Sequence, residues 1–372
     1  MEPIDPSRLS AAAQRVLSAE APGPVRLMAA RGVIPGVRPA DLLAVMVVLA
    51  GSDDAGVSAA ANAALERLPP PLLAGALGSD LEPAVIDRLA AVHASDPDHA
   101  AALLRMPRIA DDTLVALAEQ ADERLGELIA TNEDRLLRSP RVIEKLYMNR
   151  RVRMSTADRL LELAVRNDLE LDIPTYREAA AAIRDELIVE QSEEPTFDDV
   201  LFAETTVLAD ALGSHPDEDT HDEDEDGNEH VRDKFLPLHA RLAQMTVSQK
   251  VRAATLGTAA ERYLLVRDPN RLIAAAAVKS PLMRPDEAAR ISASRAVPEE
   301  VLRTIAMNRE FTRDYQVKLN LVSNPRTPLT FASRLVPLLR ENDLRSLSKS
   351  KNVPGAIQTA VRQQLERKQK RG

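Results

Sequence analysis

Apolar residues recur along this chain at the spacing of short amphipathic helices. In the N-terminal half the pattern is clear in "PAVIDRLAAVH" (83–93), "DDTLVALAEQA" (111–121) and "TADRLLELAVRN" (156–167). In the C-terminal third a proline precedes each such run, as in "RAVPEEVLRTIA" (295–306) and "KNVPGAIQTAVRQQL" (351–365). Proline suits the first turn of a helix, where its missing N–H is not needed. The pattern therefore predicts a chain of many short helices.

A short motif marks the ends of several predicted helices: an apolar pair, one further residue, then asparagine. The motif ends at Asn132, Asn149, Asn308 and Asn324. Asparagine tolerates the left-handed backbone conformation, so we expect it to end a helix at these positions. Pro298, Pro328 and Pro354 are 30 and 26 residues apart, which is about the length of two short helices with their turns. Motif and spacing together predict repeated helix pairs.

The composition favours stacked helices. The chain is 45% apolar, but only 2% of its residues are aromatic and it contains no Trp. The small side chains that dominate its apolar content allow helices to pack closely, whereas a β-sandwich would use more β-branched and aromatic residues. The chain also has no Cys. This excludes disulfides, zinc–thiolate sites, iron–sulfur clusters and cysteine nucleophiles.

The N-terminal segment "GVRPADLLAVM" (36–46) parallels "LMRPDEAARIS" (282–292), and "DAGVSAAANAALERLP" (54–69) resembles the second helix of a HEAT repeat. The "NPRTP" of 324–328 is similar to variant leucine-rich repeats, which are also all-helical. The resemblance covers about two-thirds of the chain and rests on recurrence. It implies an all-α fold, an α-solenoid of short antiparallel helix pairs, and a general role as a binding scaffold. It implies no site, and the iron–sulfur cluster of some variant-repeat proteins needs cysteines. An irregular helical bundle is the alternative.

An acidic insertion interrupts the helical pattern. Residues 190–230 contain 16 acidic residues and no Lys or Arg, although the whole chain has a net charge of only −9. We expect two helical lobes, 1–189 and 231–372, separated by this insertion. We expect the densest acidic part, 213–230, to be disordered because it is too highly charged to form a core.

One amphipathic helix is expected inside the insertion, over about 197–212. Thr196 and Asp199 have the spacing of a capping box. Six apolar residues are expected on one face: Phe197, Val200, Leu201, Val207, Leu208 and Leu212. We expect this face to dock on the protein's own helices, since leaving it exposed to water would be costly.

The insertion also contains the beginning of a calcium-binding loop. Asp222, Asp224, Asp226 and Gly227 fit the EF-hand positions 1, 3, 5 and 6. Glu229 stands where the loop needs an apolar residue, and Asp233 replaces the usual bidentate Glu. Three histidines, His215, His221 and His230, are interpreted as solvated side chains among carboxylates. We therefore predict no metal site. The common catalytic and nucleotide-binding motifs are missing as well, so we predict no catalytic residue, no cofactor and no enzyme activity.

The C-terminal third is basic. Residues 301–372 contain 15 Lys and Arg against 5 Asp and Glu. In two predicted equivalent helices, 309–320 and 341–352, basic residues recur and would form a row across stacked repeats. This basic row comprises Arg309, Arg313, Lys318, Arg345, Lys349 and Lys351. Such a row could engage phosphates or an acidic protein, or be an ordinary solvated face.

These observations favour a non-catalytic scaffold or adaptor that binds a protein partner on a solenoid surface. The alternative is nucleic-acid binding through the basic row, which the acidic insertion would mask. The N-terminus has no signal-peptide features, and the longest apolar run, 42–50, is too short to span a bilayer. We therefore expect a cytoplasmic protein without membrane insertion. The partner, the oligomeric state and the continuity of the two lobes stay open.

Overall fold

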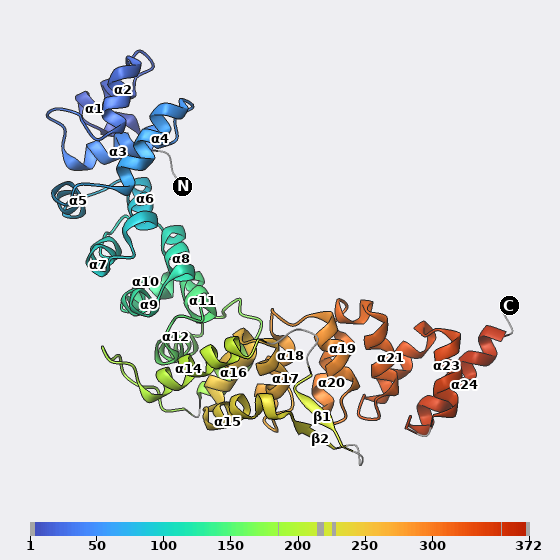
Figure 1. Ribbon diagram of the computed structural model, residues 1–372. Helices are drawn as coiled ribbons and strands as arrows, with labels where there is room; N and C mark the ends of the chain where they lie inside the picture. The colour runs from blue at the N-terminus through green and yellow to red at the C-terminus, as the bar shows by residue number, and fades with distance from the viewer. Residues whose placement is uncertain (1–3, 185, 214–218, 225–227, 351, 370–372) are drawn as a thin grey trace. The chain divides into compact units, whose positions relative to one another are not determined.

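The computed structural model describes residues 4–184, 186–213, 219–224, 228–350 and 352–369. Over these residues the fold is all-α, with one two-stranded β-hairpin (Figure 1). The chain divides into two compact units, Met1–Val152 and Arg153–Gly372. This boundary differs from the expected lobes, because residues 153–189 pack with the C-terminal unit.

The first unit contains eleven α-helices among its described residues. They are α1 (Ala11–Leu17), α2 (Gly23–Ala30), α3 (Pro39–Ala50), α4 (Ala55–Glu66), α5 (Pro70–Leu77), α6 (Pro83–His93), α7 (Pro97–Leu104), α8 (Asp111–Gln120), α9 (Glu123–Ala130), α10 (Glu133–Arg138) and α11 (Pro140–Met148), after a 3₁₀ turn, η1 (Pro6–Arg8). The long apolar run lies in α3, which packs against α1, α2, α4, α5 and α6. From there helices pack in two rows, α4–α6–α8–α11 and α5–α7–α9.

The second unit contains the remaining elements. They are α12 (Met154–Arg166), α13 (Tyr176–Ile183), α14 (Phe197–Ala211), β1 (His221–Glu223), β2 (Glu229–Val231), η2 (Asp233–Phe235), α15 (Leu236–Gln244), α16 (Val247–Leu256), α17 (Ala259–Leu265), α18 (Arg271–Lys279), α19 (Pro285–Ala293), α20 (Glu299–Met307), η3 (Phe311–Arg313), α21 (Tyr315–Ser323), α22 (Leu329–Leu335), η4 (Val336–Leu338), α23 (Glu341–Lys349) and α24 (Gly355–Gln369). One row of contacts runs α13–α16–α18–α20–α22–α24, and α19 packs on α21 beside it. Rows of short packed helices therefore occur in both units.

The helix-ending asparagines act differently from our expectation. Asn149, Asn308 and Asn324 have φ values of −90°, −77° and −78°, so none is left-handed. The Nδ2 of Asn324 instead donates to the carbonyls of Ser292 (2.9 Å) and Ser294 (2.8 Å), at the end of α19. Carbonyls in the last turn of a helix have no partner within that helix. Asn324 therefore satisfies the end of the helix packed beside it, whereas Asn132 and Asn308 accept hydrogen bonds from the main-chain N–H groups that follow them.

The first unit repeats this arrangement. The Nδ2 of Asn149, after α11, donates to the carbonyls of Ala118 (3.1 Å) and Ala121 (2.8 Å), at the end of α8. An arginine two residues after each asparagine extends the arrangement: Arg151 donates to the Gln120 carbonyl, and Arg326 donates to the carbonyls of Ala296 and Val297. The sequence motif "N-x-R" thus joins neighbouring repeats through main-chain atoms.

Candidate functional site

Helix α14 of the acidic insertion is fixed by its first turn. Thr196 and Asp199 form the expected capping box. The Asp199 carboxylate accepts hydrogen bonds from the N–H and hydroxyl of Thr196, both at 2.8 Å. It also accepts from the N–H (2.8 Å) and hydroxyl (2.9 Å) of Ser155, in the first turn of α12. Burial disfavours the charged carboxylate, but these hydrogen bonds outweigh burial and hold the pKa of Asp199 below its usual value. One carboxylate therefore joins the start of α14 to the start of α12.

The buried face of α14 is not the expected one. The helix packs against α12 and α15 within the second unit, as expected, but through Leu201, Phe202, Thr205 and Ala209. The Phe202 ring lies 5.3 Å from the guanidinium of the buried Arg252. Of the six apolar residues expected on the docked face, only Leu201 is buried. Apolar residues lie on both sides of the helix, and the side that contains Leu201, Phe202 and Ala209 is the one that packs against α12 and α15. The contact face is rotated by about a quarter turn from our prediction.

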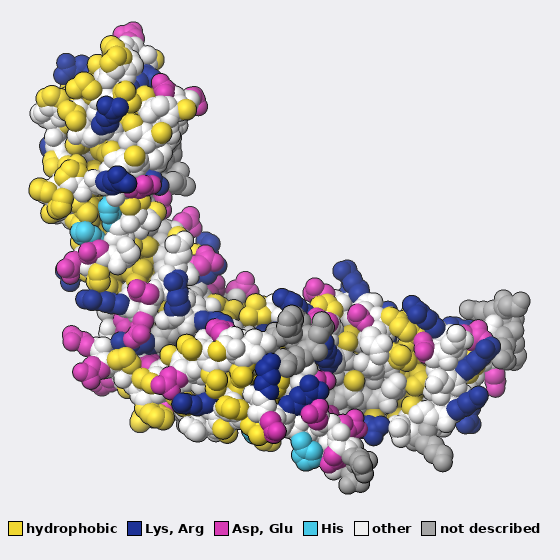
Figure 2. Space-filling view, viewed as in Figure 1, with side chains coloured by type: hydrophobic (Ala, Val, Ile, Leu, Met, Phe, Trp, Pro, Cys, Tyr) yellow, Lys and Arg dark blue, Asp and Glu magenta, His cyan; other side chains and the backbone are white. Residues whose placement is uncertain are grey.

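The outer face of α14 displays apolar side chains to solvent. Phe197, Val200 and Val207 are 74%, 44% and 67% exposed, and their spacing of three and seven residues places them on one side of the helix. We call these three residues the outer stripe. Figure 2 shows hydrophobic side chains over the region of α14 and α15. Exposed apolar side chains aligned on a firmly held helix are typical of interaction surfaces.

Carboxylates flank the outer stripe along the sequence. Glu204 lies between Val200 and Val207 on the same side of the helix, where it pairs with Arg241 of α15 at 3.0 Å. Glu190, Glu193, Glu194 and Asp210 are also exposed. No Lys or Arg occurs between 190 and 230. The stripe is therefore an apolar surface on a segment whose own charged residues are all acidic, with Arg241 of α15 pairing with Glu204 and Arg153 bound to the main chain of Ser192 and Glu193.

The acidic run itself differs from our expectation of disorder at 213–230. Within the residues described there, β1 and β2 form an antiparallel hairpin with His221 opposite Val231 and Glu223 opposite Glu229. Thr220, just before β1, is fully buried, and its carbonyl accepts from the Arg232 N–H at 3.0 Å. Residues 214–218 lie outside the described part of the chain. The charged run is ordered here because Glu229 binds Arg267 and Ser294, which are distant in the sequence.

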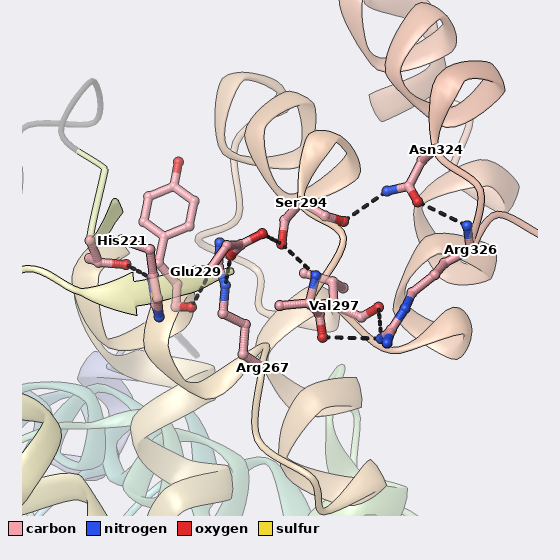
Figure 3. A network of polar contacts seen from close by, with 10 residues as sticks. His221, Glu229, Arg267, Ser294, Val297, Asn324 and Arg326 are labelled. Atoms are coloured by element: carbon pink, nitrogen blue, oxygen red, sulfur yellow. Dashed lines mark hydrogen bonds and ion pairs between the residues drawn. The ribbon is translucent and has the colours of Figure 1, made fainter. Parts of the chain in front are cut away.

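Glu229 anchors the hairpin to the second unit (Figure 3). Its carboxylate accepts from the Arg267 Nε at 2.8 Å and from the Ser294 hydroxyl. Burial alone would raise the pKa of Glu229, but the charge and hydrogen bond of Arg267, together with the hydrogen bonds from Ser294 and the Ala296 main chain, outweigh burial and lower it. The main-chain carbonyl of Ser294 is in turn an acceptor for Asn324, so the hairpin is tied to the repeat contacts described above. The nucleic-acid alternative predicts that the acidic insertion masks the basic row. Glu229 of the insertion instead binds Arg267 and Ser294, neither of which belongs to that row.

His221 lies on the docked hairpin and is not the solvated histidine we expected. Burial lowers its pKa to about 4, and the positive charges of Arg267 and His239 add to this, while Glu229 opposes it. Its Nδ1 lies 2.8 Å from the hydroxyl of Thr220. The side chain is therefore neutral near pH 7.

The calcium-loop positions give no metal site in the described residues. The Asp224 carboxylate already accepts from the Asn228 N–H at 2.8 Å and contacts His230 at 2.9 Å. Asp226 and Gly227 lie outside the described residues. Within the part of the chain that the structure describes, no three possible ligands gather as a metal ion would require.

The basic row does not occupy two equivalent helices. Arg309 is in the turn after α20, Arg313 is in η3, and Lys318 is on α21. Arg345 pairs with Glu341 on α23, and Lys349 is the last residue of that helix. Lys351 lies outside the described residues. Tyr315 is covered by the guanidinium of Arg340 at 4.4 Å and donates its hydroxyl to Asp343. The ring of Tyr315 is therefore already engaged by the chain itself.

The sequence interpretation missed the outer stripe as a surface. "FDDVLF" (197–202) places apolar residues on more than one side of a helix, so a single buried face could not contain them all. These additional apolar residues are the sequence feature from which an exposed apolar surface could have been predicted. Glu229 and Arg267 had no such signal, since 38 residues separate them.

Among the described residues, no helix has the length and apolar content needed to cross a membrane. No protein-family model matches the chain, and no curated protein or solved structure matches it significantly.

Proposed function

We propose that this chain is a non-catalytic helical-repeat scaffold that binds a protein partner at the outer stripe of α14. The observation that supports it is the exposure of Phe197, Val200 and Val207 on a helix whose other side is buried and whose start is fixed by Asp199. A surface that is already ordered loses little conformational entropy on binding. The resemblance to HEAT-like repeats agrees with a scaffold role.

The partner we propose is a basic amphipathic helix. Phe197 and Val207 are ten residues apart, which along a helix is about 15 Å and matches about three turns of a partner helix. Its apolar side chains would cover the stripe, and its Lys and Arg would face Asp210 and the exposed carboxylates before α14. Helix-in-groove recognition uses this combination of apolar anchors and complementary charge. An anionic membrane would instead be repelled by the same carboxylates.

Binding of a labelled model peptide tests the proposal. A peptide of about 14 residues, with Leu at helical spacing and Lys elsewhere, should bind the full chain in a fluorescence anisotropy titration. Val207→Asp should weaken this binding about tenfold or more, because it puts a charge into the apolar contact. Leu187→Asp is the matched control, since Leu187 is 92% exposed and lies outside the stripe, and it should have no effect.

Three results would overturn this assignment. A Leu/Glu peptide that binds as tightly as the Leu/Lys peptide would remove the role of charge. Equal affinity for wild type and Val207→Asp would remove the role of the stripe. A change in oligomeric state on Val207→Asp, measured by analytical ultracentrifugation, would identify a second copy of the chain as the occupant.

Nucleic-acid binding is the second candidate, because Arg309 and Arg313 are both exposed near the α20–α21 turn. A labelled oligonucleotide in the same titration should bind with an affinity that falls steeply with salt if this candidate holds. Tyr315 would add nothing, since base stacking needs an open ring and Arg340 covers this one.

A further inference from the structure

A cavity of about 380 Å³ lies in the first unit, where the ends of α7 and α9 meet α8, α10 and α11. Its size falls in the range of small-molecule sites, which is about 300–1,000 Å³. It is unrelated to the outer stripe, which belongs to the other unit. Nothing in the proposed scaffold function requires a cavity here.

The interior of this cavity is apolar. Leu114, Ile129, Leu136 and Val142 form its floor, and each is between 1% and 4% exposed. Leu104 and Leu128 form half-buried walls. An apolar group placed among these side chains would leave water without giving up any hydrogen bond, so the interior selects for hydrocarbon.

Two arginines stand at the edge of the cavity. Arg105 is exposed and ends α7, and Arg135 is half-buried in α10. The guanidinium of Arg135 lies 3.4 Å from the carbonyls of Leu104 and Met106, at the long end for such hydrogen bonds. None of the described residues that line the cavity is acidic. The edge therefore has positive charge that the lining residues do not neutralise.

Two other arginine-lined cavities in the protein are different. In the second unit, the cavity beneath the hairpin contains Arg232 and Arg267, which pair with Asp222 and Glu229. Near the N-terminus, Arg108 pairs with Glu82 inside another cavity. There the chain supplies its own anions. In the cavity of α7–α11 the anion would have to come from a ligand.

We propose that this cavity binds a small amphiphilic carboxylate, with its apolar group on the leucine floor and its carboxylate between Arg105 and Arg135. Guanidinium groups suit this role because they form paired, charge-assisted hydrogen bonds with carboxylates. The ligand chemistry could come from a medium-chain fatty acid or from the carboxyl end of a leucine-rich peptide. The volume excludes neither source, so both enter the test.

Calorimetric titration of the full chain with octanoate and with N-acetyl-leucyl-leucine tests the proposal. At least one should bind, and the one that binds more tightly identifies the source. Octanol and octylamine have the same chain without the negative charge and should bind at least about tenfold more weakly. Equal binding of octanol, or no binding of either carboxylate, would overturn the proposal.

Two variants locate the binding. Arg105→Glu should weaken carboxylate binding about tenfold or more, and it changes an exposed residue that the fold does not need. Arg124→Glu is the matched control, because Arg124 is exposed on α9 and does not line the cavity. Leu128→Trp should block the cavity and abolish binding. If Arg105→Glu and Arg124→Glu weaken binding equally, the ligand sits elsewhere and the assignment fails.

Discussion

The two halves of the acidic insertion are held to the same unit by opposite means. Helix α14 is attached by buried apolar side chains, Leu201 and Phe202, with one carboxylate, Asp199, fixing its start. The β1–β2 hairpin has little apolar surface to bury and depends on Glu229, which binds Arg267 and Ser294. A charged segment can therefore be ordered without a core of its own, provided that a largely buried cation such as Arg267 pairs with it. The two attachments should respond differently to mutation and to pH.

The largest expected effect is on the apolar attachment. Phe202→Ala removes a ring that is 5% exposed and packs against Arg252, so it should lower the free energy of unfolding by about 3–5 kcal/mol. Urea denaturation followed by circular dichroism measures this change. Phe197→Ala, on the exposed side of the same helix, should change stability by less than about 0.5 kcal/mol. Similar losses for the two variants would mean that α14 is not held by the face described here.

A smaller and more local effect is expected at the hairpin. Glu229→Gln leaves Arg267, whose side chain is 13% exposed, without its charged partner. Losing a partner from a buried pair is costly, but the hairpin can undock instead of unfolding the whole unit, so the cost is limited to its own docking. Hydrogen exchange at β1 and β2 should accelerate about tenfold, while exchange at α14 stays unchanged. Glu223→Gln, opposite Glu229 but exposed, should leave both unchanged.

A third effect should appear when the pH is lowered from about 6.5 to 4. His221 has a pKa of about 4 when docked and 6.5 as a free side chain, so the undocked hairpin takes up a proton first. Docking should weaken steadily through this window, since the stability that the neutral histidine contributes is present above pH 6.5 and lost below it. Asp199 has a lowered pKa and stays ionised there, so α14 should remain protected.

Hydrogen exchange across this pH range separates the two halves directly. His221→Gln should remove the weakening of the hairpin in the window while Arg267, His239 and Glu229 stay in place around it. If α14 and the hairpin lose protection together, they are one cooperative unit and the comparison fails.

Much of the helical architecture could be predicted from the sequence because each helix is short and has a local pattern. The apolar run at 42–50, for example, lies in the buried α3. The motif that ends at Asn149 and Asn324 was visible, but its role was not. A left-handed turn is a local property of asparagine, whereas the observed bonds reach carbonyls about 30 residues earlier.

The sequence could not reveal contacts that depend on distant partners. Glu229 and Arg267 look like ordinary surface charges until the fold brings them together. The boundary of the units was misplaced for the same reason: the hydroxyl of Thr175 contacts that of Thr255 at 2.8 Å, and Glu178 pairs with Lys279, across the insertion. The acidic run looked like a separator, yet helices on both sides of it pack together.

The asparagines that join neighbouring repeats have a consequence for how such a chain can change in length. Asn149 and Asn324 donate to main-chain carbonyls, which every residue has, so the joint does not depend on the side chains of the preceding helix. A duplicated or exchanged repeat that kept "N-x-R" at its end would keep these hydrogen bonds to a neighbouring helix that ends at the matching position. Copying a whole helix pair would therefore preserve these hydrogen bonds. Inserting a single residue between the paired helix ends would break both hydrogen bonds of the asparagine.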